Sequence, residues 1–263
     1  MIDAQYYGPW AVIAGGSEGV GAGFAEELSK AGINLVLIAR KPGPLGETAD
    51  KARAHGVEVR TLELDLLAPD AVDRIRNATD DIEVGLLIFN AGANSYGHEF
   101  VTGDLAGFQG VIDLNITSQL HLSHLFGAAM KERGRGGIIL LGSLSGYMGA
   151  EDQSIYSAAK AFGRIFAESL WLELEPCGVH VVELILGVTR TPAMERAGLN
   201  FDLPGMNVAE PYDVAREGLA HITDGPVWVA GGNYEAVKKR SAFPRDTLVK
   251  GAAEGMRKLL GRR

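Results

Sequence analysis

A tyrosine and a lysine four residues apart, Tyr156 and Lys160, are the side chains whose types and spacing most directly indicate chemistry. Residues four apart on a helix share one face, so both can act on one bound molecule. A nearby ammonium favours the phenolate and brings a phenol closer to a working general acid and base. Ser143, thirteen residues before Tyr156, adds a hydroxyl that can orient a substrate carbonyl. An isolated pair of this kind is usually two surface residues of an amphipathic helix, so the surrounding sequence must decide.

A glycine-rich run near the start of the chain predicts a dinucleotide site. The run is AGGSEGVG at 14–21, between a predicted strand and a predicted helix. Gly15 permits a tight turn, Gly19 permits close approach of a pyrophosphate, and Gly21 lets the helix pack close to the sheet. Amide groups at the helix N-terminus attract the anion. Because the spacing G-x-x-x-G-x-G differs from G-x-G-x-x-G, the run alone is also compatible with a simple strand-to-helix turn.

Aliphatic runs alternate with longer amphipathic stretches, which predicts βα units around a parallel sheet. The predicted strands are 10–14, 34–39, 58–63, 85–90, 137–142, 180–186 and 227–230. The predicted helices are 21–31, 45–55, 69–78, 108–133, 154–175 and 211–223. Together they indicate a single α/β domain with a doubly wound parallel sheet of about seven strands, a Rossmann fold.

Composition excludes several classes of function. The 263 residues are 46% hydrophobic and 22% charged, and the net charge of −8 gives no reason to expect a nucleic-acid partner. The single cysteine, Cys177, excludes an intramolecular disulfide and a cysteine-based zinc cluster. His121 and His124 have no further ligands at a metal-site spacing, so we expect no metal. No apolar run reaches membrane-spanning length and the first residues do not resemble a signal peptide, so we expect a cytoplasmic protein.

Taken in order, these marks resemble the short-chain dehydrogenases/reductases of about 250 residues, over nearly the whole chain. The matching marks are Ala14-Gly-x-x-x-Gly-x-Gly21, Asp65, Asn90-Ala-Gly92, Asn115, Ser143, Tyr156-x-x-x-Lys160 and Gly187-x-x-x-Thr191. The resemblance implies a catalytic tetrad of Asn115, Ser143, Tyr156 and Lys160. It also implies a cofactor site formed by Gly15, Ser17, Gly19, Val20, Gly21, Arg40, Asp65, Leu66, Asn90, Ala91, Gly92, Tyr156, Lys160, Thr189 and Thr191.

Simpler interpretations of some of these residues stay open at this stage. By resemblance, Asn115 interrupts helical hydrogen bonding and supports a water chain to the lysine, but it could also be a solvent-facing helical residue. Asp65 could cap the next turn and still face adenine, and 90–92 could be only a strand-terminating turn. Ala14 stands where the family usually carries threonine or serine, which predicts a glycine loop held less tightly.

Cofactor preference should be encoded at the end of the second strand, where a carboxylate binds the ribose 2′-hydroxyl and a basic residue binds a 2′-phosphate. The residues there are Ala39, Arg40 and Lys41. Because a guanidinium can bind a phosphate through two hydrogen bonds, we expect NADP(H) to be preferred, with NAD(H) as the alternative. Glu18 is the opposing signal, since many NADP-using relatives carry a basic residue there.

Segments 7–21, 39–41 and 186–192 are similar to those of bacterial NADP-dependent 7β-hydroxysteroid dehydrogenases. This narrower resemblance implies that a bulky alicyclic or steroid-like alcohol or ketone is among the candidate substrates. Loops 93–103 and 192–210 follow strand ends and should select the substrate. The second loop is apolar, so it either covers a hydrophobic substrate or packs on the body of the protein.

We therefore expect residues 1–237 to form an NADP(H)-dependent oxidoreductase that interconverts a secondary alcohol and a ketone, with Tyr156 as general acid and base. Residues 238–263 are predicted to form a basic amphipathic C-terminal extension. It either packs on its own subunit or a neighbouring one, or binds acidic lipid or an acidic partner. The resemblance implies a homodimer or homotetramer formed through helices 108–133 and 154–175. The alternative is a dinucleotide-binding sensor or partner-binding protein on the same fold, which would not need an intact tetrad.

Overall fold

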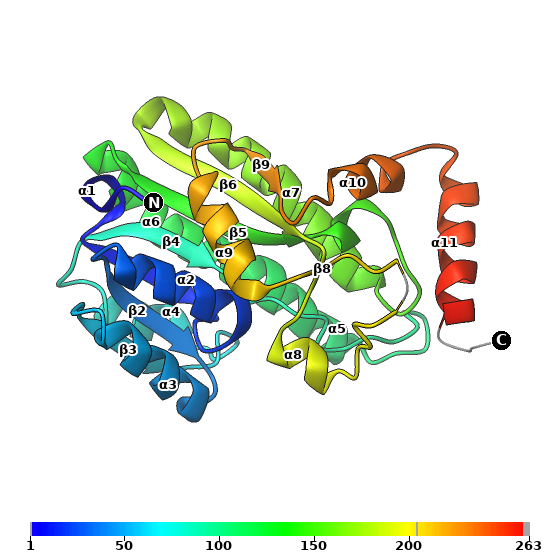
Figure 1. The fold of residues 1–263 in the computed structure, drawn as a ribbon, viewed down its shortest axis with the longest axis horizontal. Helices are drawn as coiled ribbons and strands as arrows, with labels where there is room; N and C mark the ends of the chain where they lie inside the picture. Colours follow the sequence, from blue (N-terminus) through cyan, green and yellow to red (C-terminus); the bar gives the residue numbers. More distant parts are fainter. Residues whose placement is uncertain (1, 204, 260–263) are drawn as a thin grey trace.

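Seven parallel strands form the central sheet, in the order β3-β2-β1-β4-β5-β6-β9 (Figure 1). The computed structural model describes residues 2–203 and 205–259. The strands are β1 (Trp10–Ala14), β2 (Asn34–Ala39), β3 (Val59–Glu63), β4 (Val84–Phe89), β5 (Gly136–Ser143), β6 (Val179–Leu186) and β9 (Val227–Val229). The predicted doubly wound parallel sheet is confirmed.

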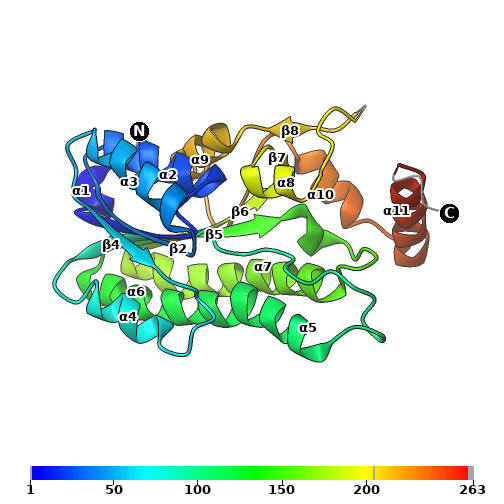
Figure 2. The same cartoon turned by 90° about the horizontal axis from the view of Figure 1, so that it is seen from below.

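Helices cover both faces of this sheet, as Figure 2 shows. One face carries α2 (Gly19–Lys30), α3 (Pro42–Arg53) and α9 (Pro211–Ala220). The other carries α4 (Ala71–Asn77), α6 (Ser118–Arg133) and α7 (Ser154–Leu174). Alternate residues of the buried strands point to the two faces, so the sheet separates two apolar clusters. Such two-sided burial requires the nearly continuous aliphatic strands found in the sequence.

The helix predicted at 108–133 is divided in the structure. α5 (Leu105–Ile112) begins three residues earlier, because the side chain of Asp104 accepts hydrogen bonds from two of its first amides. A π-helical turn, η1 (Asp113–Thr117), then separates α5 from α6. Asn115 lies in this turn and is 2% exposed, so it is not a solvent-facing helical residue.

Short elements outside the predicted set organise the loops. They are α1 (Ala4–Tyr7), η2 (Leu144–Tyr147), η3 (Glu175–Cys177), β7 (Val188–Thr189), α8 (Pro192–Arg196) and β8 (Val208–Ala209). β7 and β8 pair in parallel as a second small sheet. The apolar segment predicted as a loop at 192–210 therefore begins with a helix and ends with a strand.

The C-terminal segment forms two helices, α10 (Tyr234–Arg240) and α11 (Arg245–Leu259). The boundary predicted at 238 falls inside α10. In both ribbon views α11 stands apart from the sheet and its covering helices (Figures 1 and 2), and Arg257 lies 3.4 Å from Glu151. Residues 260–263 of the predicted basic extension lie outside the described residues. No helix in the described part of the chain is both long and apolar enough to span a membrane.

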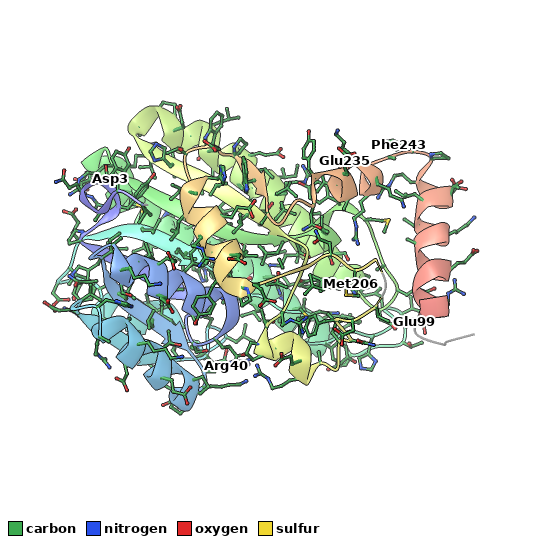
Figure 3. The ribbon with its side chains drawn as sticks, in the orientation of Figure 1. Asp3, Arg40, Glu99, Met206, Glu235 and Phe243 are labelled. Atoms are coloured by element: carbon green, nitrogen blue, oxygen red, sulfur yellow. The ribbon has the colours of Figure 1, made fainter. Side chains whose placement is uncertain are left out.

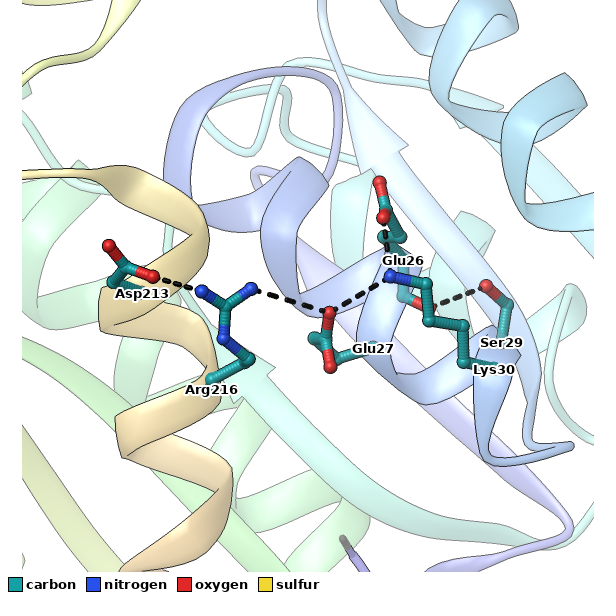
Figure 4. Close-up of polar contacts among 6 residues, drawn as sticks. All are labelled: Glu26, Glu27, Ser29, Lys30, Asp213 and Arg216. Carbon is teal, nitrogen blue, oxygen red and sulfur yellow. Dashed lines mark hydrogen bonds and ion pairs between the residues drawn. The ribbon is translucent and has the colours of Figure 1, made fainter.

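Helices α2 and α9 pack closely because Gly23 of α2 has no side chain. The space beside it is taken up by α9. A Cβ at residue 23 would lie 3.0 Å from the Cβ of Ala215. At the surface, Arg216 lies between Asp213 and Glu27, and Lys30 pairs with Glu27 and Glu26 (Figure 4). Exposed ion pairs of this kind contribute little to stability. The close apolar contact therefore dominates this interface.

We predict that Phe24→Ala lowers the free energy of unfolding by about 3–5 kcal/mol. The Phe24 side chain is fully buried between α2 and the sheet, so truncation loses buried apolar area and leaves a cavity. Denaturant unfolding followed by circular dichroism measures the change. Val101→Ala is the control, because Val101 is 81% exposed and should change stability by less than about 0.5 kcal/mol. Equal losses for the two variants would contradict this assignment of the core.

Candidate active site

The glycine loop has the backbone geometry that a bound pyrophosphate needs. Gly15 and Gly19 have φ values of +85° and +59°, where a side chain would be strained. A Cβ at residue 21 would lie 2.0 Å from the carbonyl oxygen of Gly15, so only glycine fits at the start of α2. The first amides of α2 are left open toward an anion by this tight turn.

The glycine loop is fixed to the neighbouring strands despite the missing hydroxyl at Ala14. The side-chain amide of Asn90 donates to the carbonyl oxygen of Gly15 at 2.7 Å. The amides of Gly15 and Gly16 both donate to the carbonyl of Ile38, at 2.8 and 3.1 Å. Asn90, beyond its role in a strand-ending turn, thus supplies a tie between the loop and the end of β4.

Asn115, Lys160 and Gly92 meet at one point beyond the end of β4. A Cβ at residue 92 would lie 2.8 Å from Asn115 Oδ1 and 2.9 Å from Lys160 Nζ. The Asn115 amide donates to the carbonyls of Ala93 and Val111 at 3.0 and 2.9 Å, while its buried Oδ1 has no hydrogen-bond partner among the described residues. An acceptor kept unpaired beside an ammonium fits a relay site better than a structural one.

Helix α7 presents Tyr156 and Lys160 on the same face, as the spacing predicted. The Lys160 ammonium lies 5.8 Å from the centre of the Tyr156 ring. Lys160 is 8% exposed, and its Nζ donates to the carbonyl of Leu141 at 2.8 Å. Ser143 ends β5, two residues after Leu141, and its Oγ accepts a hydrogen bond from the Ser145 amide at 3.1 Å. The end of β5 therefore positions both Ser143 and the lysine.

Charged side chains gather where β2 ends. Arg40 projects from this end of the sheet (Figure 3), and its guanidinium lies 3.8 Å from the carboxylate of Asp65. Lys41 lies 3.9 Å from Glu18, which Arg196 of α8 also binds through both of its carboxylate oxygens. Direct hydrogen bonds from Arg196 hold the pKa of Glu18 below its ordinary value. Glu18 therefore stays an anion whose charge is balanced by Arg196, which weakens the opposing signal in the sequence.

The remaining predicted cofactor residues line the same edge of the sheet. Thr191 lies against the glycine loop, since a Cβ at Gly19 would come within 3.0 Å of its methyl group. Val20 and Thr189 are buried. Leu66 packs against the cluster beneath α4, and the side chain of Asp65 accepts a hydrogen bond from the Leu67 amide. The main chain of Ser17 accepts a hydrogen bond from Thr48, and the Ala91 amide would lie 2.9 Å from a Cβ at Gly15.

Three further residues shape this region, and the sequence did not predict this role for them. Arg196 binds a glutamate 178 positions earlier, which no local pattern reveals. Asn233 is buried against Gly187 and accepts a hydrogen bond from Asn207, joining the segment after β9 to the small sheet. Glu183 lies in an aliphatic strand run and is buried. Among the described residues, no three histidine, cysteine, aspartate or glutamate side chains form a group that could hold a metal ion.

Comparison with known proteins identifies the family. The model of the short chain dehydrogenase family matches residues 9–200. A 7β-hydroxysteroid dehydrogenase of Clostridium sardiniense is 30% identical over 247 residues, which cover 93% of this chain and 94% of that protein. A structure from a study of 7β-hydroxysteroid dehydrogenase stereoselectivity superposes with a TM-score of 0.87 at 25% identity, covering 95% of this chain and 99% of the other. A short-chain dehydrogenase from Sphingobium yanoikuyae in complex with NADPH has a TM-score of 0.78 at 31% identity, covering 95% of each chain.

The chain therefore belongs to the short-chain dehydrogenase family. It is an oxidoreductase that acts on hydroxyl or keto groups, as the resemblance in the sequence predicted. The solved structures similar to it include a complex with NADPH. The tight turn at Gly15 and Gly19 before α2 suits the pyrophosphate of a dinucleotide.

We predict that Gly92→Ala lowers turnover by more than about tenfold, which corresponds to about 1.4 kcal/mol of transition-state stabilisation. The added methyl group would occupy the space between Asn115 Oδ1 and Lys160 Nζ and push them apart. Steady-state reduction of a ketone by NADPH measures the loss. Gly110→Ala is the matched control, because nothing lies within 4 Å of a Cβ there. Full activity of Gly92→Ala would contradict a functional role for this junction.

Proposed function

We propose that the protein is an NADP(H)-dependent oxidoreductase that interconverts a secondary alcohol and a ketone on a hydrophobic substrate. The observation that carries the proposal is that the side chains of Asn115 and Lys160 meet at Gly92. Lys160 lies one helical turn from Tyr156 on α7. A buried lysine beside a buried amide oxygen that has no partner among the described residues is unusual in a structural core, and this arrangement supports a catalytic role.

Each residue of the tetrad would then have a distinct task. When bound, the nicotinamide supplies or removes hydride at the reacting carbon. Tyr156 donates its phenolic proton to the carbonyl oxygen during reduction and accepts it back during oxidation. The Ser143 hydroxyl, oriented by the Ser145 amide, donates to the same oxygen. Lys160 uses one of its three N–H groups on Leu141, which leaves two for the ribose hydroxyls. The side-chain carbonyl of Asn115 accepts a hydrogen bond from the water chain that returns protons to Lys160.

The preference for NADP(H) rests on the charges beyond β2. Arg40 and Lys41 each have a single carboxylate at 3.8–3.9 Å, a separation too long for a direct hydrogen bond. Both cations can therefore bind a 2′-phosphate without breaking a strong contact. The Glu18 carboxylate is already bound by Arg196, so its charge opposes the phosphate less than the sequence suggests.

The substrate should be bulky and apolar. A cluster of three aromatic side chains follows β4. The ring centres of Tyr96 and Phe108 are 5.0 Å apart, and those of Phe100 and Phe108 are 5.2 Å apart. The segment after β7 adds Met194, Leu199, Phe201, Leu203, Met206 and Val208. Both segments follow strands at the carboxyl edge, where ligands bind in this class of fold. The likeness to 7β-hydroxysteroid dehydrogenases supports an alicyclic or steroid-like molecule.

We further propose a homodimer or homotetramer formed through α6 and α7. On α7, Phe162, Ile165 and Leu172 are exposed, and Leu172 is 67% exposed. Apolar side chains along one helix support an interface.

Residues 1–237 would be the catalytic domain and 238–263 its extension. The cytoplasmic location stays a prediction from the sequence.

We predict that Tyr156→Phe lowers kcat by at least about 100-fold, because the proton donor is lost while the ring is kept. NADPH consumption is followed with aliphatic, aromatic and steroid ketones. Tyr234→Phe, at a tyrosine that is 59% exposed, is the control and should keep full activity. Turnover by Tyr156→Phe equal to that of the unmodified protein would contradict the proposal. Tight cofactor binding without turnover of any substrate would instead favour a dinucleotide sensor.

We predict that Arg40→Gln weakens NADPH binding by about tenfold, or about 1.4 kcal/mol, and leaves NADH binding within about twofold. In the proposed assignment the guanidinium binds the 2′-phosphate, which NADPH has and NADH lacks. Quenching of protein fluorescence gives both dissociation constants. Lys51→Gln, an exposed cation near the end of α3, controls for loss of a positive charge. Equal weakening of both cofactors would refute the assignment of Arg40 to the phosphate.

A further inference from the structure

A buried carboxylic acid, Glu183, lies in the core next to the catalytic elements. It is on β6, is 1% exposed, and its Oε2 has no hydrogen-bond partner among the described residues. Glutamate is almost never fully buried unless it is paired. The proposed reaction assigns Glu183 no task, so its presence needs a separate explanation.

Two glycines make room for the Glu183 carboxyl. A Cβ at Gly142 would lie 2.7 Å from Glu183 Oε1, and a Cβ at Gly163 would lie 2.9 Å from the same oxygen. Gly142 directly precedes Ser143 on β5, and Gly163 follows Lys160 by three residues on α7. The carboxyl therefore lies between the two elements that carry Ser143, Tyr156 and Lys160.

The third neighbour of this carboxyl is α6, which follows Asn115. The same Cβ position at Gly163 lies 3.8 Å from both polar atoms of the Gln119 side chain. Gln119 is buried, and its Nε2 has no hydrogen-bond partner among the described residues. Glu183 and Gln119 thus border one polar space, and each has a buried polar atom without a hydrogen-bond partner among the described residues. Such groups require polar partners in a folded core.

Titratable groups on α7 and η2 interact with the Glu183 carboxyl. Burial raises the pKa of Glu183 to about 8, while Lys160 and Arg164 act in the opposite direction and Glu168 adds to the rise. On η2, burial raises the pKa of Tyr147 to about 12, and Glu183 contributes to that rise. The Glu183 carboxyl is thus neutral through the neutral range and becomes an anion as the pH rises through about 8.

We propose that Glu183 is a positioning residue of the active site, a titratable carboxyl of β6 that lies against β5 and α7 and adjusts the charge around Lys160. This inference rests on the proposed roles of Tyr156 and Lys160. Once ionised, Glu183 adds a negative charge near Lys160, which lies one helical turn from Tyr156. In this proposal that charge disfavours a second negative charge on the phenol. The anion therefore keeps the proton donor loaded at alkaline pH.

The test is the pH dependence of kcat in Glu183→Gln, which keeps the shape of the side chain and removes its charge. The alkaline limb of the ketone-reduction profile should move to lower pH by on the order of 0.5 pH unit, because no anion then holds the phenolic proton. Glu173→Gln, at an exposed carboxylate of α7, the helix that carries Tyr156 and Lys160, should leave the limb in place. A merely structural role would lower the melting temperature without moving this limb. An unmoved limb in folded Glu183→Gln would overturn the inference.

A second measurement needs neither a variant nor turnover. Infrared spectra of the unmodified protein should show the carbonyl stretch of a protonated carboxylic acid near neutral pH, and this band should disappear as the pH rises through about 8. Absence of the band at neutral pH would overturn the inference even if Glu183→Gln failed to fold. Because the band is independent of activity, its presence together with an inactive protein would indicate failure of the proposed function alone.

Discussion

Two backbone turns meet closely at the carboxyl ends of β1 and β4, and the site depends on this meeting. The side chain of Asn90 crosses the gap to the Gly15 carbonyl, which lies 75 positions earlier in the chain. The strand order brings β1 and β4 side by side, so the sheet itself imposes the contact. Side chains at 15, 21 or 92 would occupy space that is now used by backbone or by polar atoms of the site. Glycine at these positions is a steric requirement of the site.

The polar groups around this contact are buried and held mainly by main-chain carbonyls. Lys160 donates to Leu141 at the end of β5, and Asn115 donates to Ala93 and Val111. Main-chain partners move little, so these side chains are oriented before a ligand binds. The π-helical turn at 113–117 has a similar effect, because it changes the hydrogen bonding of the helix where Asn115 must face inward.

The parts of the fold that could be predicted depend on local patterns. The aliphatic strands, the glycine loop and the Tyr156 and Lys160 spacing are visible in short windows, and the first two determine the sheet and its first turn. The π-helical turn is invisible to periodicity, because its residues suit a regular helix equally well. The two-residue strands β7 and β8 form through tertiary contacts. The pairing of Glu18 with Arg196 joins residues far apart in the chain, and the room for Glu183 comes from glycines on two other elements.

Transfer of deuterium tests the central claim most directly. NADPH deuterated at the reactive carbon is incubated with a bulky alicyclic ketone, and the alcohol is analysed by mass spectrometry and NMR. We expect one deuterium on the carbinol carbon in a single configuration, because a fixed site presents one face of the carbonyl. Saturable NADPH binding with no deuterium in any product across a broad panel of ketones would contradict the claim.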